Sequence, residues 1–336
     1  MTRSKPLACA ALLLTIVLGA CGTGPRENAD GTTTVRYQGQ VGGVTPIELA
    51  GELGHLPGIE LEWIGNTISG PQDIQSVATG QTEIGGAFNG AIVKLVAAGS
   101  PIRAVISYYG SDAETAIGFW TLEDSPIKGP RDLIGKKIAV NTLGAHLEAV
   151  IKEYLQRGGL TPEEIEQVEL VVVPPVNAEQ SLRQGQVDVA SLNGVLKEKA
   201  LERGGVEELF NDVELLGGEF NAGSYVLRND FVEKNPEAAR TLVTGVGQAL
   251  DWVRTQPRKA VLARFEEIVS KRGRNEDSSS LKYFKGYGVS SQGGRIADGE
   301  FGTWIDWLAR EGEVEPGIKP ADVFTNEFNQ SKEPAK

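Results

Sequence analysis

Residues 132–144, DLIGKKIAVNTLG, contain the pattern that decides the fold class. Gly135 permits a turn, two lysines keep the next segment's start in solvent, and residues 138–140 are apolar enough for a buried strand. Residues 141–144 then form a short polar loop before a run with helical spacing over 144–158. A buried strand that leads through a short loop into a helix is the repeating unit of α/β folds.

The same alternation continues along most of the chain from residue 35 and predicts α/β layers with a largely parallel sheet. The predicted strands are 34–39, 59–64, 83–87, 103–108, 115–121, 137–140, 168–173, 187–191 and 222–228. The predicted helices are 45–54, 70–79, 89–98, 144–158, 178–184, 194–203, 237–254, 257–271 and 300–311.

Two stretches echo each other, ATGQTEIGGAF at 78–88 and RQGQVDVASLN at 183–193. In both, Gly80 or Gly185 suits a helix C-terminus with positive φ, and a short apolar strand follows. The strands lead to Asn89 and Asn193. The echo favours two lobes of like construction that place strand ends at a common cleft, although helix-glycine-strand turns also recur in unrelated α/β proteins.

The N-terminus has the features of an export signal. Arg3 and Lys5 precede an apolar run over 7–18, which is shorter than the roughly 20 residues of a membrane-spanning helix. LGAC at 18–21 resembles the bacterial lipobox, in which the cysteine receives a diacylglycerol. We therefore expect a signal peptide over 1–20 and a tether over 21–34, lipidated at Cys21. The protein would be exported and lipid-anchored to the outer face of the cell membrane, or periplasmic; a buried N-terminal helix is the alternative.

Composition excludes several functions. The formal net charge is -12 without long blocks of one sign, which disfavours a nucleic-acid partner. With two cysteines and two histidines in the chain, and no EF-hand pattern, we expect no metal. The chain also lacks a phosphate loop, a dinucleotide fingerprint and a nucleophile elbow, so we expect no cofactor, no catalytic residue and no enzyme activity.

Several segments resemble the substrate-binding proteins of ABC importers in the nitrate, sulfonate and taurine group. The most specific is EDSPIKGPRDLIGKKIAVNTLGAHLEAVIKEYLQRGGL at 123–160. The others are SGPQDIQSVATGQTEIGGA (69–87), VVVPPVNAEQSLRQGQVDVASL (171–192), VLRNDFVEKNPEAARTLV (226–243) and KPADVFTNEF (319–328). The resemblance implies a bilobed type II periplasmic-binding fold, in which two α/β lobes close around a ligand by hinge motion.

On this basis the first lobe is expected over 35–115 and 223–336, and the second over 116–222, with hinges near 109–117 and 219–225. The resemblance implies a monomer that captures a small organic or oxyanion solute and delivers it to a membrane permease with a cytoplasmic ATPase. The alternatives are a ligand-binding sensor that docks on a receptor and an enzyme similar to pyrimidine-precursor synthases.

Candidate ligand-binding residues follow predicted strands, and the resemblance adds His146 near a helix start. They are Gly42, Gly43, Ser69, Gly70, Asn89, Tyr109, Asn141, Thr142, His146, Asn193 and Asn221. Each has a structural alternative: a plain turn for the glycines, a helix cap for Ser69, Asn141 and Thr142, and core or surface packing for Tyr109 and His146.

Four asparagines and few charges suggest a neutral or weakly ionised hydrogen-bonding ligand. They disfavour a tightly held divalent anion, although the free N–H groups of a helix end can hold an anion without arginine.

Overall fold

The computed structural model describes residues 26–274 and 276–331, so the predictions for the signal peptide and Cys21 lie outside the described residues. The tether predicted over 21–34 is partly wrong. Strand β1 (Arg26–Glu27) pairs antiparallel with β2 (Thr33–Gly39), and the turn between them is held by Asn28, whose amide donates to the Thr32 hydroxyl at 2.8 Å. Residues 26–34 therefore belong to the fold because their backbone completes a sheet edge.

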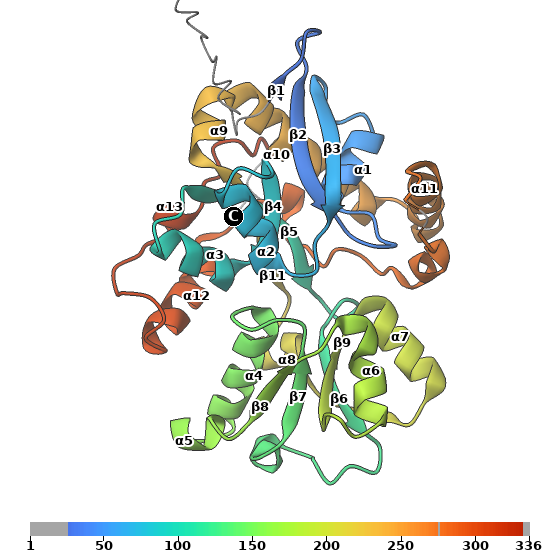
Figure 1. Ribbon diagram of the computed structural model, residues 1–336, viewed down its shortest axis with the longest axis vertical. Coiled ribbons are helices and arrows are strands. Elements are labelled where there is room, and N and C mark those ends of the chain that lie inside the picture. The colour runs from blue at the N-terminus through green and yellow to red at the C-terminus, as the bar shows by residue number, and fades with distance from the viewer. Residues whose placement is uncertain (1–25, 275, 332–336) are drawn as a thin grey trace, which may run out of the picture.

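The chain forms two lobes, which are seen one above the other in Figure 1. The first lobe, residues 26–111 and 220–331, holds two three-stranded sheets. Their orders are β1-β2-β3, with β3 at Ile59–Asn66, and β4-β11-β5, with β4 at Ile84–Phe88, β11 at Phe220–Arg228 and β5 at Ile102–Ser111. Its helices are α1 (Pro46–Glu52), α2 (Gly70–Ala78), α3 (Asn89–Ala97), α9 (Asn229–Lys234), α10 (Pro236–Thr255), α11 (Arg258–Lys271), α12 (Asp298–Arg310) and α13 (Pro320–Val323). Two 3-10 turns, η2 (Ser278–Tyr283) and η3 (Gln292–Gly294), lie between α11 and α12.

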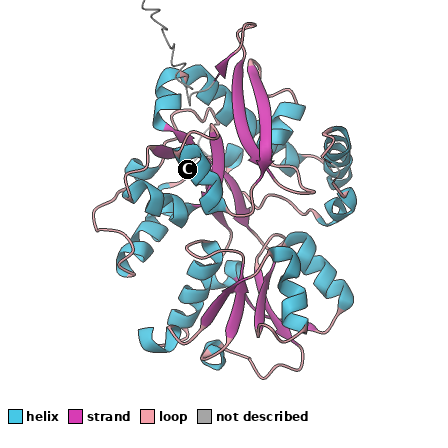
Figure 2. Ribbon diagram, in the orientation of Figure 1, coloured by secondary structure: helices cyan, strands magenta, loops and turns pink. Residues whose placement is uncertain are grey.

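The second lobe, residues 118–211, is built on one five-stranded sheet with helices on both sides, as Figure 2 shows. The strand order is β10-β6-β9-β7-β8. The strands are β6 (Gly118–Leu122), β7 (Lys137–Val140), β8 (Glu169–Val172), β9 (Val189–Leu192) and β10 (Val206–Asn211). The helices are α4 (His146–Arg157), α5 (Pro162–Ile165), α6 (Pro175–Arg183) and α7 (Gly194–Arg203), with a 3-10 turn η1 (Pro130–Leu133). Helix α8 (Asp212–Leu216) follows β10 and leads back toward the first lobe.

The predicted strands and helices are confirmed, with ends that differ by a few residues, and Gly80 and Gly185 have the expected positive φ of 76° and 67°. The prediction of a largely parallel sheet is wrong. Strand β11 runs antiparallel to both β4 and β5, and β6 runs antiparallel to β9 and β10. The reason is topological. In the first lobe, β5 runs toward the crossing and β11 returns from it beside β5. In the second lobe, β6 runs away from the crossing and β10 returns toward it beside β6.

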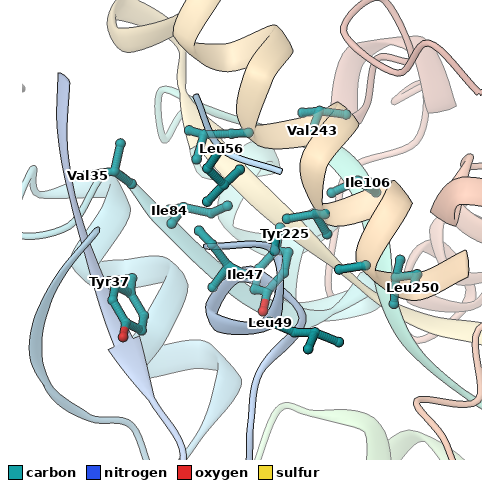
Figure 3. Packing of buried hydrophobic residues seen from close by; sticks show 14 of the residues in the cluster. Val35, Tyr37, Ile47, Leu49, Leu56, Ile84, Ile106, Tyr225, Val243 and Leu250 are labelled. Atoms are coloured by element: carbon teal, nitrogen blue, oxygen red, sulfur yellow. The ribbon is translucent and has the colours of Figure 1, made fainter. Parts of the chain in front are cut away.

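The core of the first lobe lies on both faces of the β4-β11-β5 sheet. Along β11, Tyr225 and Leu227 belong to the cluster under α1 and α10, whereas Val226 faces the cluster under α3 and α12. This alternation is the two-residue period of a strand buried on both faces. Figure 3 shows Ile47 of α1 and Val243 of α10 in the first of these clusters.

Two short segments, 112–117 and 212–219, connect the lobes. The first lies within the predicted range of 109–117, and the second lies mostly before the predicted range of 219–225 because β11 already begins at Phe220. Asp212 ties them together: its carboxylate accepts from the Ser111 hydroxyl at 2.7 Å and from the Ile117 N–H at 2.9 Å. The backbone N–H of Asp212 also donates to the Ile117 carbonyl at 3.1 Å. The two crossings are therefore hydrogen-bonded to each other.

The lobes also contact each other on two flanks away from the crossings. On one flank, the Tyr283 hydroxyl of η2 donates to Glu202 of α7 at 2.8 Å. On the other, the Gln156 side-chain amide of α4 donates to Glu311 at 2.8 Å, and Arg310 lies 3.4 Å from Glu153. These polar contacts span the gap between the lobes on both sides.

Candidate functional site

A cleft of about 540 Å³ lies between the two lobes. The first lobe contributes residues 38–46, the start of α2, the ends of β4 and β5, and a segment over 280–287. The second lobe contributes residues around 141–147 and 191–196. Because strand ends and helix starts from both lobes meet here, the cleft is the place where this fold can bury a small solute.

Aromatic rings cover the first-lobe side of the cleft. Tyr108 stacks on Tyr225 with ring centroids 4.1 Å apart, and Tyr109 meets Tyr108 edge to face at 5.0 Å. Phe88, at the end of β4, stacks on His146 of the second lobe at 5.1 Å. The rings provide a broad apolar surface with π faces and edges for a planar solute.

Two glycines make room for these rings. A Cβ at Gly86 of β4 would lie 2.5 Å from the Tyr108 ring, and one at Gly223 of β11 would lie 2.0 Å from the Tyr109 ring. Both distances are below any ordinary contact, so a larger residue at either position would displace a tyrosine. The glycines of IGGAF at 84–88 and of FNAGSYVLR at 220–228 therefore have a packing role beside the cleft.

Asp73 is a buried carboxylic acid in the cleft wall. It lies in the first turn of α2, lines the cleft and is 6% exposed. Its Oδ2 accepts from the Gly86 N–H at 2.7 Å, whereas its Oδ1 has no hydrogen-bond partner. Burial raises the pKa of Asp73 to about 7, and the single bond from Gly86 only partly opposes that rise.

His146 lies at the first position of α4, at the back of the cleft. Its Nε2 is 3.5 Å from an Asp212 carboxylate oxygen without hydrogen-bond geometry, and neither ring nitrogen has a partner. Burial lowers the pKa of His146 to about 4, so the ring is neutral at pH 7 and the contact with Asp212 is no ion pair. Its stacking on Phe88 makes it an apolar contact between the lobes.

Polar side chains line the second-lobe side of the cleft. Asn193 precedes α7 as its N-cap residue, but its side chain makes no capping hydrogen bond and is exposed. Asn141 and Thr142 do not cap α4 either, since Ala145 occupies that position. On the opposite side, Ser69 is the N-cap residue of α2, again without a side-chain capping bond. These groups keep hydrogen-bonding capacity that the local helices do not use.

The structure brings most of the predicted site residues to this cleft. Those that line it are Gly42, Gly43, Ser69, Gly70, Tyr109, Asn141, Thr142, His146 and Asn193. Their role in ligand binding stays a prediction.

Asn89 and Asn221 were placed wrongly. Asn89 is fully buried at the start of α3, where its Oδ1 accepts from the Ser224 hydroxyl at 2.8 Å. Asn221 donates to Glu300 at 2.9 Å and accepts from the Ser290 N–H at 3.0 Å. Both amides hold the first lobe together, because helices pack over the strand ends that the sequence pattern left open.

Sequence reasoning missed several residues of the cleft. Asp73 resembled an ordinary acidic residue near a helix start, and nothing in its sequence neighbourhood shows that one oxygen is buried without a partner. Tyr225 lies inside a strand, where a buried aromatic residue is the usual expectation. The segment LKYFKGYG at 281–288 has a usable signal, since it is rich in tyrosine, phenylalanine and glycine and breaks the run of helices.

The charges that line the cleft are few. Lys285 lies 3.2 Å from Glu114 and 3.6 Å from Glu198, so its charge is neutralised by two carboxylates. No arginine is among the described residues that line the cleft. Elsewhere in the described ranges, no group of three His, Cys, Asp or Glu side chains is placed to hold a metal ion, and no helix has the length and apolarity to cross a membrane.

Comparison with known proteins agrees with this architecture. The profile of the NMT1/THI5-like family matches residues 49–260, which is more than half of the chain. The chain belongs to the NMT1/THI5-like family.

Among its relatives is a candidate binding protein of Brucella abortus (strain 2308). It is 22% identical over 278 residues, which cover 79% of this chain and 80% of the relative.

Solved structures similar to this NMT1/THI5-like protein show the fold. The periplasmic aliphatic sulphonate binding protein SsuA of Escherichia coli matches with a TM-score of 0.66 at 18% identity, over 90% of this chain and 96% of SsuA. The desulfurization enzyme DszB matches with a TM-score of 0.59 at 18% identity, over 88% of this chain and 97% of the enzyme. The bilobed type II periplasmic-binding fold is thereby confirmed, and it is a fold on which both binding proteins and an enzyme occur.

Proposed function

We propose that this NMT1/THI5-like protein is the extracytoplasmic solute-binding component of an ABC importer. The observation that carries the proposal is the cleft: unused polar groups from both lobes face one cavity, and two short crossings connect the lobes. In this role the protein captures a small solute and delivers it to a membrane permease, with energy from ATP on a cytoplasmic subunit.

The crossings suit a hinge. Because Asp212 bonds to residues at both ends of the first crossing, the two segments move as one unit when the lobes rotate. Rotation changes the distance between the flanks, where Tyr283 contacts Glu202 and Gln156 contacts Glu311. Solute bound between Ser69 and Asn193 would stabilise the closed arrangement because it contacts both lobes.

Capture suits the cleft better than catalysis. Catalysis by a nucleophile needs a hydroxyl or thiol within hydrogen-bond reach of a base. His146 is the histidine that lines the cleft, and within the described residues it bonds to no hydroxyl and no thiol. We therefore propose a binding protein, in agreement with the name of the Escherichia coli neighbour rather than that of the desulfurization enzyme.

The proposed location, the outer face of the cell membrane, rests on the sequence of residues 1–25. The lipobox at 18–21 would place a diacylglycerol on Cys21 and hold the exported protein at the outer face of the cell membrane. Membrane fractionation tests this. Cys21→Ser should move the protein to the soluble fraction or block its maturation, and an unchanged membrane fraction would contradict the anchor.

A thermal-shift screen tests solute binding. The soluble protein, residues 22–336, is mixed with nitrate, bicarbonate, alkyl sulfonates, taurine, purines, pyrimidines, riboflavin and small amides. A solute at about 100 times its Kd should add roughly 2.7 kcal/mol to the free energy of unfolding. Asn141→Ala and Asn193→Ala should weaken binding of any hit, and unchanged affinity in both variants would contradict the assignment of this cleft.

Crosslinking in producing cells separates import from sensing. A membrane permease recovered with the protein, and lost when the solute is withheld, supports delivery to an importer. Recovery of a receptor kinase instead would replace the importer by a sensor.

A further inference from the structure

We infer that the cleft selects a planar solute that presents an N–H group, neutral or positively charged, to the Asp73 carboxylate, and that it disfavours sulfonates and other oxyanions. This inference rests on the proposed solute-binding function and specifies its ligand class. It makes Asp73 the residue that determines specificity.

The first observation is the free oxygen of Asp73. Asp73 is 6% exposed and lines the cleft. Its Oδ2 has a hydrogen-bond partner, whereas its Oδ1 has none. A buried acceptor without a hydrogen bond destabilises a protein by about 1 to 3 kcal/mol. A bound molecule is one of the ways in which such an acceptor gains its missing donor. Because Asp73 lines the cleft, a solute bound there can supply this donor.

The second observation is the aromatic surroundings of this carboxylate. Tyr108 and Tyr225, which are stacked on each other, both line the cleft. Gly86 links the ring of Tyr108 to the carboxylate: its N–H donates to Asp73, and a Cβ on it would lie 2.5 Å from the Tyr108 ring. Burial raises the pKa of both tyrosine hydroxyls, and the charge of Asp73 adds to that rise. Stacked rings beside a carboxylate fit a flat ring whose face lies on the aromatic surface and whose N–H points at the oxygen.

The third observation is the charge balance. Lys285 is already paired with Glu114 and Glu198, and no arginine lines the described part of the cleft. In the ionised protein, Asp73 is therefore a charged lining residue that has no oppositely charged partner among the described residues. A sulfonate would meet a carboxylate at short range without a cation to compensate, whereas an N–H donor would gain a charge-assisted hydrogen bond.

Three probes on one ring test this inference: benzamidinium, benzamide and benzenesulfonate. Isothermal titration calorimetry at pH 8 measures the Kd of each for the soluble protein, residues 22–336. We expect the tightest binding for benzamidinium, weaker binding for benzamide and the weakest for benzenesulfonate.

Asp73→Asn is the decisive variant. An amide has one oxygen, which the Gly86 N–H occupies, so the amide NH₂ replaces the free carboxylate oxygen. We expect the Kd of benzamidinium to rise at least tenfold and that of benzenesulfonate to fall. Glu300→Gln is the matched control, because it neutralises a half-buried carboxylate that also has a raised pKa but lies outside the residues that line the cleft. It should leave all three Kd values unchanged.

Three results would overturn the inference: tighter binding of benzenesulfonate than of benzamidinium, an unchanged benzamidinium Kd in Asp73→Asn, or no binding of any probe. The melting temperature of the empty Asp73→Asn protein, expected to be no lower than that of the wild type, excludes misfolding as the cause of a loss. If no probe binds but another solute from the wider screen does, solute binding stands and this inference falls. If the wild type binds no solute at all, both fall.

Discussion

Two buried aspartates differ in how many hydrogen bonds their carboxylates accept. Asp212 lies at the crossings between the lobes, and Asp73 lies in the cleft wall. Asp212 is fully buried and accepts hydrogen bonds from Ser111 and Ile117, and burial raises its pKa to about 6. Asp73 is also buried and has a pKa raised to about 7, but one of its oxygens has no partner. Burial alone therefore does not distinguish the two carboxylates, whereas the number of hydrogen bonds that their oxygens accept does.

The largest expected effect is at Asp212. Asp212→Ala leaves the buried Ser111 hydroxyl and the Ile117 N–H without an acceptor, so we expect a loss of about 3 kcal/mol in the free energy of unfolding. Urea denaturation at pH 7 measures it. Asp212→Asn keeps one acceptor oxygen and should lose less. A loss below about 1 kcal/mol for the alanine variant would contradict a structural role for this carboxylate.

The next effect is expected at Asn221, which the sequence pattern places in the cleft and the structure places inside the first lobe. Asn221→Ala removes bonds to Glu300 and to the Ser290 N–H and should cost about 2 kcal/mol of unfolding free energy. Solute affinity should stay within about twofold of the wild type, since a factor of two is roughly 0.4 kcal/mol. A stable Asn221→Ala protein with weakened solute binding would return Asn221 to the site.

Asp73→Asn should reduce the pH dependence of stability between about pH 4 and pH 7. The folded pKa of Asp73, about 7, lies above its ordinary value of 3.8, so the folded protein holds the proton more tightly than the unfolded chain. Protonated Asp73 therefore stabilises the folded wild type fully below about pH 4. This contribution to the free energy of unfolding is lost as the pH rises through about 7.

Denaturation of both proteins at pH 4 and at pH 8 measures the difference. The variant should match the wild type at the lower pH and exceed it at the higher pH, because the asparagine has no charge to bury. Tyr108 and Tyr225 stay neutral over this range, since the pKa of each lies well above its ordinary value. Equal stability differences at both pH values would show that Asp73 does not ionise at an unusual pH.

The smallest effect is expected at Asn193. Its exposed side chain makes no capping bond, so Asn193→Ala should change the free energy of unfolding by less than about 0.5 kcal/mol. Melting curves of the empty protein measure this. A clear loss of stability would mean that the amide supports the second lobe, and the contrast with the structural asparagines Asn89 and Asn221 would disappear.

The α/β elements could be predicted because their signals are local. Apolar runs of four to eight residues, glycine at helix ends and helical spacing all act within one turn or strand, so the element order follows from neighbouring residues. Strand direction could not be predicted in the same way. Strand β11 is antiparallel to its neighbours because the chain returns through the second crossing, and strand pattern alone does not encode that path.

The echo between residues 78–88 and 183–193 shows the limit for site residues. Asn89 and Asn193 have the same local signal, an asparagine directly after a short apolar strand. In the tertiary structure, Asn89 bonds to Ser224 of a neighbouring strand under α3, whereas Asn193 remains exposed at the cleft. The difference is decided by Ser224, which is 135 residues from Asn89 in the chain. A prediction based on neighbouring residues cannot include a partner at that distance.

The sequence by itself determined the fold class, the order of the elements and the resemblance to solute-binding proteins, because these depend on periodicity and short motifs. The tertiary structure decided which polar groups are satisfied. It gave the Asp212 carboxylate its donors from Ser111 and Ile117 and left one oxygen of Asp73 beside the cleft without any. The physical reason is that hydrogen-bond satisfaction depends on atoms brought together from distant parts of the chain, whereas secondary structure depends mainly on atoms that are already neighbours.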